Sequence, residues 1–100
     1  MSRFSVRYFD KPNARLSLIS PFFDHDTFPI IGLEFVELIS GKVLEKQQDA
    51  DLHSWLIDFE GCQLMLRAEH YSESMWLEAL SVEQSQAELQ FLANLISKGM

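Results

Sequence analysis

The chain is poor in cysteine and glycine and has no long apolar run. Cys62 is its only cysteine, which excludes an intramolecular disulfide and a zinc site of the Cys-x-x-Cys kind. The four glycines are dispersed, and no linker, repeat or low-complexity tract divides the sequence. We therefore expect a single domain over residues 1–100.

Segments that would direct the chain into or across a membrane are missing as well. The most apolar stretch, residues 28–39, contains Glu34 and Glu37 and is shorter than the ~20 apolar residues of a transmembrane helix. Charged and polar residues recur near the amino terminus too often for a secretory signal. We expect a cytoplasmic protein without a membrane partner, and the single thiol agrees with a reducing compartment.

Catalytic and nucleotide-binding motifs are also absent. The sequence has no Gly-x-x-x-x-Gly-Lys, Gly-x-Gly-x-x-Gly, Gly-x-Ser-x-Gly or His-Glu-x-x-His, which disfavours nucleotide-binding proteins and the common hydrolases. The net charge is −7, and residues 21–100 hold fourteen acidic side chains against four basic ones. Such an acidic surface repels phosphate backbones, so we expect no nucleic-acid partner.

What the sequence does contain is alternation of apolar and polar residues, which predicts six strands. The first two, residues 4–8 and 15–19, flank a polar turn. They form a hairpin that either joins the main sheet or lies apart from it. Four more strands are expected at residues 42–48, 52–59, 62–71 and 74–80.

Two segments have helical spacing instead. The first helix spans about residues 26–40, with Asp24 or Asp26 as its N-cap. The second begins at Ser81 as N-cap, has Gln84 as the capping-box partner and ends near residue 98. The order β-β-α-β-β-β-β-α predicts a two-layer α+β fold, in which a mainly antiparallel sheet carries both helices on one face.

The register of the central hairpin follows from its apolar face, because residues opposite each other in an antiparallel pair share a face. A two-residue turn at Glu60–Gly61 gives the pairs Phe59 with Cys62, Ile57 with Leu64, Trp55 with Leu66, and His53 with Ala68. The same rule at the next corner pairs His70 with Met75, Ala68 with Leu77, and Leu66 with Ala79. The expected core residues on this inner face include Trp55, Ile57, Phe59, Leu64, Leu66 and Leu77.

The opposite, outer face of the predicted sheet is only half polar. It carries five large apolar residues, namely Leu52, Leu56, Met65, Trp76 and Leu80, and an ion pair between Arg67 and the opposing Glu78. A solvated sheet face rarely carries so much apolar surface, so we expect these five residues to form an interface. A twofold homodimer is the commonest way to cover such a patch, and the folded-back N-terminal hairpin is the intramolecular alternative.

One group of residues has the composition of a reactive or metal site. The predicted register sets Asp51 opposite His70, with His53 on the same face. A carboxylate beside two imidazoles can bind a metal ion or act as an acid–base pair. The alternative is structural, since each histidine at the end of an apolar face can instead hydrogen-bond to backbone or water.

Two other candidates have weaker support. Asp24, His25 and Asp26 carry metal-ligand atoms, but consecutive residues rarely converge on one ion, and both aspartates serve as helix caps. Cys62 points inward beside Phe59 and has acidic neighbours in the sequence, whereas a catalytic thiol needs a cationic one. We therefore expect Cys62 to be an inert, buried residue.

Three segments carry a family resemblance: Trp55 to Cys62, Glu69-His70-Tyr71 and Trp76-Leu77-Glu78. They resemble a family of short bacterial proteins classed as a domain of unknown function. That resemblance implies a bacterial source and no particular activity. The small, acidic, helix-flanked sheet is also similar in style to secretion-chaperone-like domains, which is an analogy of fold alone.

Three functional hypotheses follow. The leading one is a noncatalytic, self-associating or protein-binding module that uses the outer face and needs no cofactor or metal. The second is a small enzyme or metal-binding protein that uses Asp51, His53 and His70. The third is a small-ligand-binding domain with an apolar pocket between the sheet and the helices.

Overall fold

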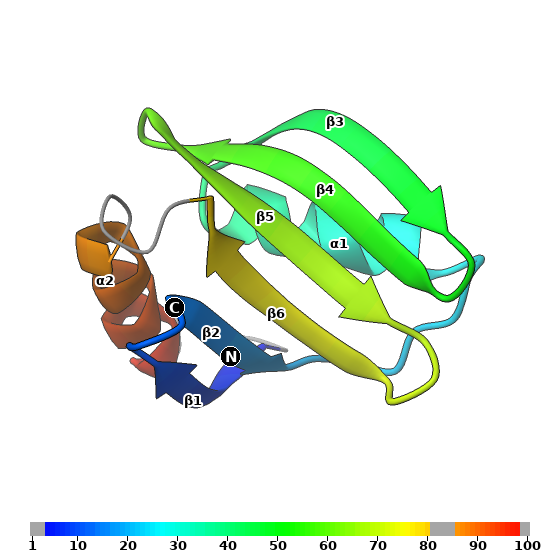
Figure 1. Ribbon diagram of the computed structural model, residues 1–100, viewed down its shortest axis with the longest axis horizontal. Helices are drawn as coiled ribbons and strands as arrows, with labels where there is room; N and C mark the ends of the chain where they lie inside the picture. The colour runs from blue at the N-terminus through cyan, green and yellow to red at the C-terminus, as the bar shows by residue number, and fades with distance from the viewer. Residues whose placement is uncertain (1–3, 81–85, 99–100) are drawn as a thin grey trace.

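The computed structural model describes residues 4–80 and 86–98 and has the expected order of elements. The elements are β1 (Ser5–Asp10), β2 (Arg15–Ile19), α1 (Phe28–Leu38), β3 (Lys42–Asp49), β4 (Leu52–Phe59), β5 (Cys62–Glu69), β6 (Ser74–Ala79) and α2 (Gln86–Ser97). The strands form one antiparallel sheet in the order β1-β2-β6-β5-β4-β3 (Figure 1). The predicted α+β class is therefore confirmed.

The N-terminal hairpin joins the main sheet, which decides between the two arrangements that its sequence allowed. Strand β2 pairs with β6, and the pairing extends into the hairpin turn, where the amide of Ala79 donates to the carbonyl of Ala14 over 3.0 Å. The hairpin extends the sheet at its edge. It does not fold back over the outer face.

The β4–β5 register is the predicted one in all four pairs, from Phe59 with Cys62 to His53 with Ala68. Glu60 and Gly61 have φ values of 51° and 85°. Two successive positive φ angles are what a two-residue type I′ turn requires, and such a turn matches the twist of the strands that it joins.

The predicted β5–β6 register is wrong by two residues. The observed partners are Ala68 with Met75, Leu66 with Leu77, and Leu64 with Ala79. The corner is a four-residue turn, in which the carboxylate of Glu69 accepts hydrogen bonds from the amide and hydroxyl of Ser72 at 2.9 and 2.7 Å. Because the shift is even, every side chain keeps its predicted face.

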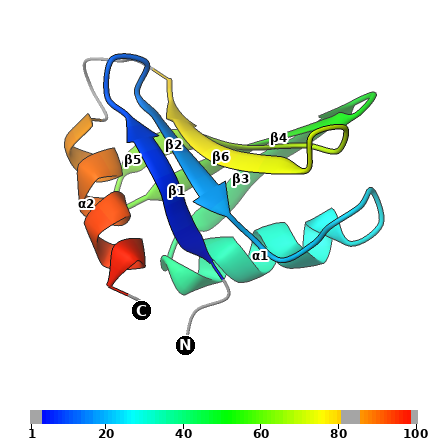
Figure 2. The ribbon, with the colours of Figure 1, turned by 90° about the horizontal axis from the view of Figure 1, so that it is seen from below.

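Both helices pack on the inner face of the curved sheet, as expected (Figure 2). Helix α1 lies along β3 and β4, and α2 lies against β1, β2 and β6. The six core residues expected on the inner face are all buried, none with more than 3% of its surface exposed. A two-layer core of this kind removes one face of the sheet from water.

Helix α1 is shorter than predicted and has a different cap. Its N-cap residue is Thr27, whereas both predicted caps, Asp24 and Asp26, precede it in the chain. The helix can approach the sheet closely because of Gly32, where a Cβ atom would lie 2.9 Å from the ring of Trp55. It ends in a Schellman pattern, with Ser40 at φ 60° and the Gly41 amide donating to the Val36 carbonyl over 2.8 Å.

Helix α2 presents Leu89, Leu92 and Ile96 to the core, in agreement with its predicted apolar spacing. The expected cap residues Ser81 and Gln84 lie outside the described residues. Across the described part of the chain, no helix is long and apolar enough to cross a membrane.

Candidate functional site: a three-histidine cluster

Three histidines from separate segments meet at one end of the sheet. His25 lies in the loop before α1, His53 in β4, and His70 in the turn after β5. One ring nitrogen from each can be chosen such that all three atoms lie within 4.8 Å of one another. The chain has three histidines in total, so all of them are in this cluster.

The sheet positions two of the three residues. His53 is on the inner face of β4, and the β4–β5 register places Asp51 opposite His70, as predicted. The amide of His70 donates to the carbonyl of Asp51 over 2.9 Å, which continues the ladder beyond the last strand residues. The rings of His53 and His70 consequently lie edge to face, with centroids 4.7 Å apart.

The turn before α1 supplies the third residue. The carboxylate of Asp24 accepts hydrogen bonds from the amides of Asp26 and Thr27 at 2.9 and 2.8 Å, and these bonds lower the pKa of Asp24. The amide of Asp24 donates to Thr27 Oγ1 over 2.8 Å. This compact turn places the ring of His25 on that of His70. The two rings stack with their centroids 3.8 Å apart.

His25 belongs to this cluster, and sequence reasoning missed it there. The sequence placed His25 only in a local group with Asp24 and Asp26. In the structure the carboxylate of Asp24 accepts hydrogen bonds from backbone amides of its own turn. Bringing His25 to His53 depends on the path of the loop across the end of the sheet, which no local pattern encodes. Gln48 was missed for the same reason, although its side chain contacts His25.

Burial separates this cluster from an ordinary group of surface histidines. His53 is 3% exposed. Its Nε2 atom and both ring nitrogens of His70 are buried and have no hydrogen-bond partner in the described protein. The structural alternative gave these atoms backbone or water as partners, and within the described residues no backbone group takes that place. Leaving a buried polar atom unpaired costs about 1–3 kcal/mol.

The surroundings of the cluster favour the neutral form of His53 and His70. Burial lowers the pKa of His53, and the nearby His70 and His25 lower it further. Burial likewise lowers the pKa of His70, against the opposing effect of the carboxylates of Asp51, Asp24 and Glu69. A neutral imidazole has a free lone pair, which is the form that binds a metal ion.

Oxygen and amide groups surround the exposed side of the cluster. Asp51 Oδ1 lies 3.6 Å from His25 Nε2, and both side chains are about half exposed. The side-chain nitrogen of Gln48 lies 2.8 Å from His25 Nδ1. Rotating the Gln48 amide would place its oxygen at a protonated Nδ1 and leave Nε2 free, which is how ligating histidines are usually oriented.

Aromatic side chains form the other walls. The ring centroids of Phe28 and His53 are 4.6 Å apart, and those of Phe23 and His70 are 5.6 Å apart. Both phenylalanines are buried. The cluster therefore has an apolar interior side and a polar, acidic outer side, as metal sites commonly do.

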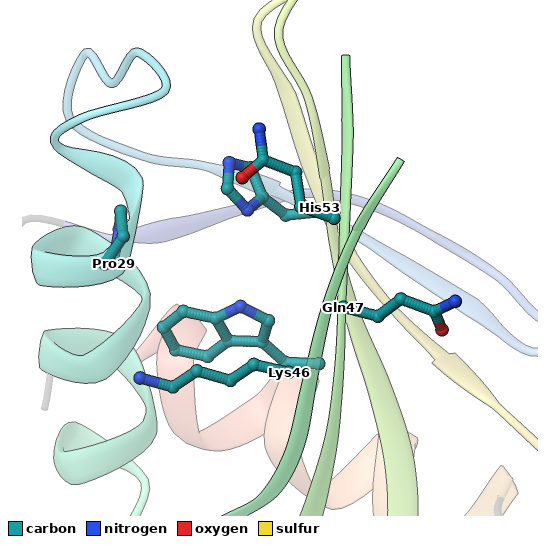
Figure 3. A pocket seen from close by; sticks show the side chains of 6 residues that line it. Pro29, Lys46, Gln47 and His53 are labelled. Carbon is teal, nitrogen blue, oxygen red and sulfur yellow. The ribbon is translucent and has the colours of Figure 1, made fainter. Parts of the chain in front are cut away.

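A pocket of about 220 Å³ adjoins the cluster between α1 and the strands β3 and β4 (Figure 3). His53 and Trp55 form part of its wall, and the other lining residues are Pro29, Lys46, Gln47 and Gln48. The location matches the sequence hypothesis of a pocket between sheet and helices. Its wall, however, is part polar.

The predicted interface residues lie on the outer face, but the register correction rearranges them. Trp76 is opposite Arg67, and Met65 is opposite Glu78. The indole of Trp76 donates to Glu78 over 2.8 Å, and Arg67 forms an ion pair with the same carboxylate at 2.9 Å, diagonally rather than directly opposite. Leu52, Leu56 and Met65 are partly buried, and Leu80 follows the end of β6 and is exposed.

Cys62 is partly buried and packs against the core at the start of β5, beside its partner Phe59. It lies far along β5 from His70 and has no place in the histidine cluster. Its contact with the core agrees with the expected inward orientation, but the sequence predicted a buried residue and Cys62 is only partly buried.

The comparisons with known proteins identify a family and no activity. No curated protein and no solved structure matches the chain. Residues 4–97 match the family described as "Protein of unknown function (DUF3630)". This agrees with the resemblance to an uncharacterised family that the hairpin residues carried. Because the match spans nearly all of the chain, the protein belongs to the DUF3630 family.

Proposed function

We propose that this protein binds a divalent transition-metal ion of the zinc class through His25, His53 and His70. The observation that carries the proposal is the convergence of three imidazoles from three segments, in which the buried ring nitrogens of His53 and His70 have no hydrogen-bond partner among the described residues. Asp51 is close enough to complete the ligand set or to hold a metal-bound water.

The donor set selects the class of ion. Imidazole nitrogen suits zinc, cobalt, nickel and copper, whereas calcium and magnesium prefer oxygen ligands. Zn–N bonds of about 2.0–2.1 Å place tetrahedral ligand nitrogens about 3.4 Å apart. The ring nitrogens of the cluster lie within 4.8 Å of one another, so metal binding requires them to move together by at most about 1.4 Å.

Charge also supports a cation here. The carboxylates of Asp24, Asp51 and Glu69 all act on His70. The whole chain carries a net charge of −7. An added cation therefore meets buried imidazoles whose neutral form is favoured, inside a negative field.

Metal titration of the purified protein tests this proposal. The protein must carry no polyhistidine tag, because such a tag would itself bind the metal ion. We expect one Zn²⁺ or Co²⁺ per chain, measured by calorimetry and by metal analysis after dialysis. His25→Ala removes one ligand from a half-exposed position, so the fold survives. Its metal affinity should fall by about tenfold or more.

Asp26→Asn is the matched control, because Asp26 is an exposed neighbour of His25 whose side chain is not part of the cluster. Its metal affinity should stay at the parental value. A parental protein that binds no metal at micromolar concentration would overturn the proposal. So would an Asp26→Asn variant as impaired as His25→Ala, because the aspartates would then be ligands.

Self-association through the outer face is a second proposal. The observation that favours it is that both helices cover the inner face, so Leu52, Leu56 and Met65 have no helix packed over them. Metal binding and self-association use opposite faces and are compatible. The cytoplasmic location and bacterial source stay predictions from the sequence.

A further inference from the structure

Helix α1 is apolar on its solvent-facing side as well as on the side that packs against the sheet. Glu34 and Glu37 are its only polar residues. Its buried residues are Phe28, Ile31, Gly32, Phe35 and Val36. On the other side Ile30 is 68% exposed and Leu33 is 43% exposed. Because a helix that is apolar all round is normally covered on every side, the described residues leave this side of α1 without its cover.

An open, mostly apolar hollow of about 490 Å³ lies along the same side of the helix. It is lined by Pro29, Ile30, Leu33, Glu34 and Glu37 of α1 and by Lys46 of β3. Figure 3 shows Lys46 extending from its strand toward α1. The hollow is about three times as large as a ~150 Å³ cavity that holds one benzene molecule, so it has room for more than one large side chain. The α1 residues that line it span about two helical turns, or about 12 Å.

The charge around the hollow selects a cationic occupant. Glu37 is exposed and Glu34 is partly buried, and both carboxylates line the hollow. Lys46 is the one basic residue of the wall, and its ammonium group lies 4.6 Å from the centroid of the Trp55 ring. The wall therefore has two carboxylates against one ammonium group, in a chain of net charge −7. A second copy would bring the same two carboxylates, and an anionic membrane surface would be repelled, whereas lysine and arginine are attracted.

The neighbouring strand favours a helical occupant over an extended one. Strand β3 is the edge of the sheet beside the hollow, but its register is irregular between Val43 and Glu45. Such a bulge disturbs the row of backbone groups with which an added strand would pair. Helix α1 instead presents an apolar stripe of about two turns, which matches the i, i+3, i+4 and i+7 anchors of an amphipathic helix.

We propose that the exposed side of α1 binds an amphipathic helix of a partner protein. The apolar side chains of that helix pack on Pro29, Ile30 and Leu33, and its lysine or arginine side chains lie beside Glu34 and Glu37. None of the three clustered histidines lines the hollow, so this surface is separate from the proposed metal site. It is also separate from the outer face of the sheet, because α1 packs on the inner face.

Fluorescence anisotropy with a labelled peptide tests the proposal. The probe is an amphipathic helix of leucine and lysine, about 18 residues long, and its counterpart has glutamate at every lysine position. We expect saturable binding of the lysine peptide in the micromolar range and no binding of the glutamate peptide. Leu33→Gln should weaken binding of the lysine peptide about tenfold, because it removes an apolar contact. Phe22→Gln is the matched control, since Phe22 is exposed and does not line the hollow.

A second pair of variants tests the charge. Glu37→Gln should weaken binding of the lysine peptide about threefold. Glu73→Gln makes the same change of charge at an exposed position in the turn between β5 and β6, outside the hollow, and should leave the affinity unchanged. Circular dichroism checks that each variant is folded.

Several outcomes overturn the proposal. One is a lysine peptide that shows no saturable binding, and another is an equal effect of Leu33→Gln and Phe22→Gln. Equal effects of the two glutamate substitutions would mean that the peptide follows net charge alone. Conversion of a dimer to a monomer by Leu33→Gln would assign this side of α1 to a second copy, and binding of phosphatidylserine vesicles in place of the peptide would assign it to a membrane. The proposed metal site stands or falls separately, by metal titration.

Discussion

His53 is the residue on which the candidate site depends most, because it is buried among apolar rings and still presents an unpaired nitrogen. Burial and both neighbouring histidines all lower the pKa of His53, so each of these effects opposes the protonated form. Phe28 and Trp55 cannot solvate a charge, and the neighbouring histidines repel one. In the metal-free protein, protonation of His53 must therefore oppose folding.

We predict that the metal-free protein loses stability as the pH falls below about 6.5, the ordinary histidine pKa. The pKa values of His53 and His70 are lower in the folded chain than in the unfolded chain. At pH values between the folded-state pKa and the unfolded-state pKa, the unfolded chain binds more protons than the folded chain. The contribution of these histidines to the free energy of unfolding is therefore fully present above pH 6.5 and declines below it. Thermal melts in chelator over about pH 5 to 8 measure this.

His53→Phe is the informative variant for this prediction, since a phenyl ring packs on Phe28 and cannot titrate. Its melting temperature should depend less on pH over that range. The contribution of Asp24, whose pKa is lowered by backbone hydrogen bonds, is lost only below its ordinary value of 3.8 and does not overlap. A parental melting temperature that stays level from pH 7 to about pH 5 would contradict the prediction.

At the scale of elements, turn chemistry decides how far the sequence predicts the fold. The β4–β5 register was predictable because Glu60–Gly61 is a recognisable two-residue turn between alternating strands. Alternation alone determines only which face a residue occupies, so a shift by two residues at the next corner went unseen. That shift depends on the side chain of Glu69 accepting hydrogen bonds from Ser72, a contact that requires the folded turn.

The candidate site was predictable to the same extent. Asp51, His53 and His70 follow from one hairpin register and were identified. His25 reaches them through the loop between β2 and α1, whose path depends on how α1 packs on the sheet. Gly32 permits that packing, and its role is visible only once the Trp55 ring is in place.

We predict that Gly32→Ala destabilises the protein by about 1–3 kcal/mol, because the new methyl group would overlap the Trp55 ring and push α1 away from the sheet. The sign is diagnostic, since the same change at an uncrowded helix position stabilises by about 0.5–1 kcal/mol. Urea unfolding measures the difference. Ile30→Ala, at an exposed position of α1, is the control and should change stability little.

At the scale of the whole molecule, the two edges of the sheet are poor surfaces for association. Strand β1 has an irregular register between Val6 and Tyr8, and β3 has one between Val43 and Glu45. Such bulges, together with the charged side chains of β3, discourage another strand from adding to an edge. The proposed self-association is therefore expected to use the outer face.

The outer face carries apolar residues on which the proposed dimer would rest, and two of them, Leu56 and Met65, are partly buried. Leu56 and Met65 are adjacent across β4 and β5. Trp76 lies one row away, with the guanidinium of Arg15 5.2 Å from its ring and a hydrogen bond to Glu78. Aromatic residues at the centre of a patch tend to dominate interface energy, so Trp76 is the expected anchor.

We predict a twofold dimer at micromolar concentration, with a mass by light scattering of about twice 11.6 kDa. Replacing Leu56 and Trp76 together by glutamine should give a folded monomer, because both side chains lie outside the core between sheet and helices. Phe22→Ser is the control, since it removes an exposed aromatic ring from the loop between β2 and α1 and should leave the mass of the dimer unchanged. A monodisperse mass of 11.6 kDa for the parental protein would exclude the dimer. The proposed metal site is independent of this result, because His53 lies on the inner face, with His25 and His70 beside it at that end of the sheet.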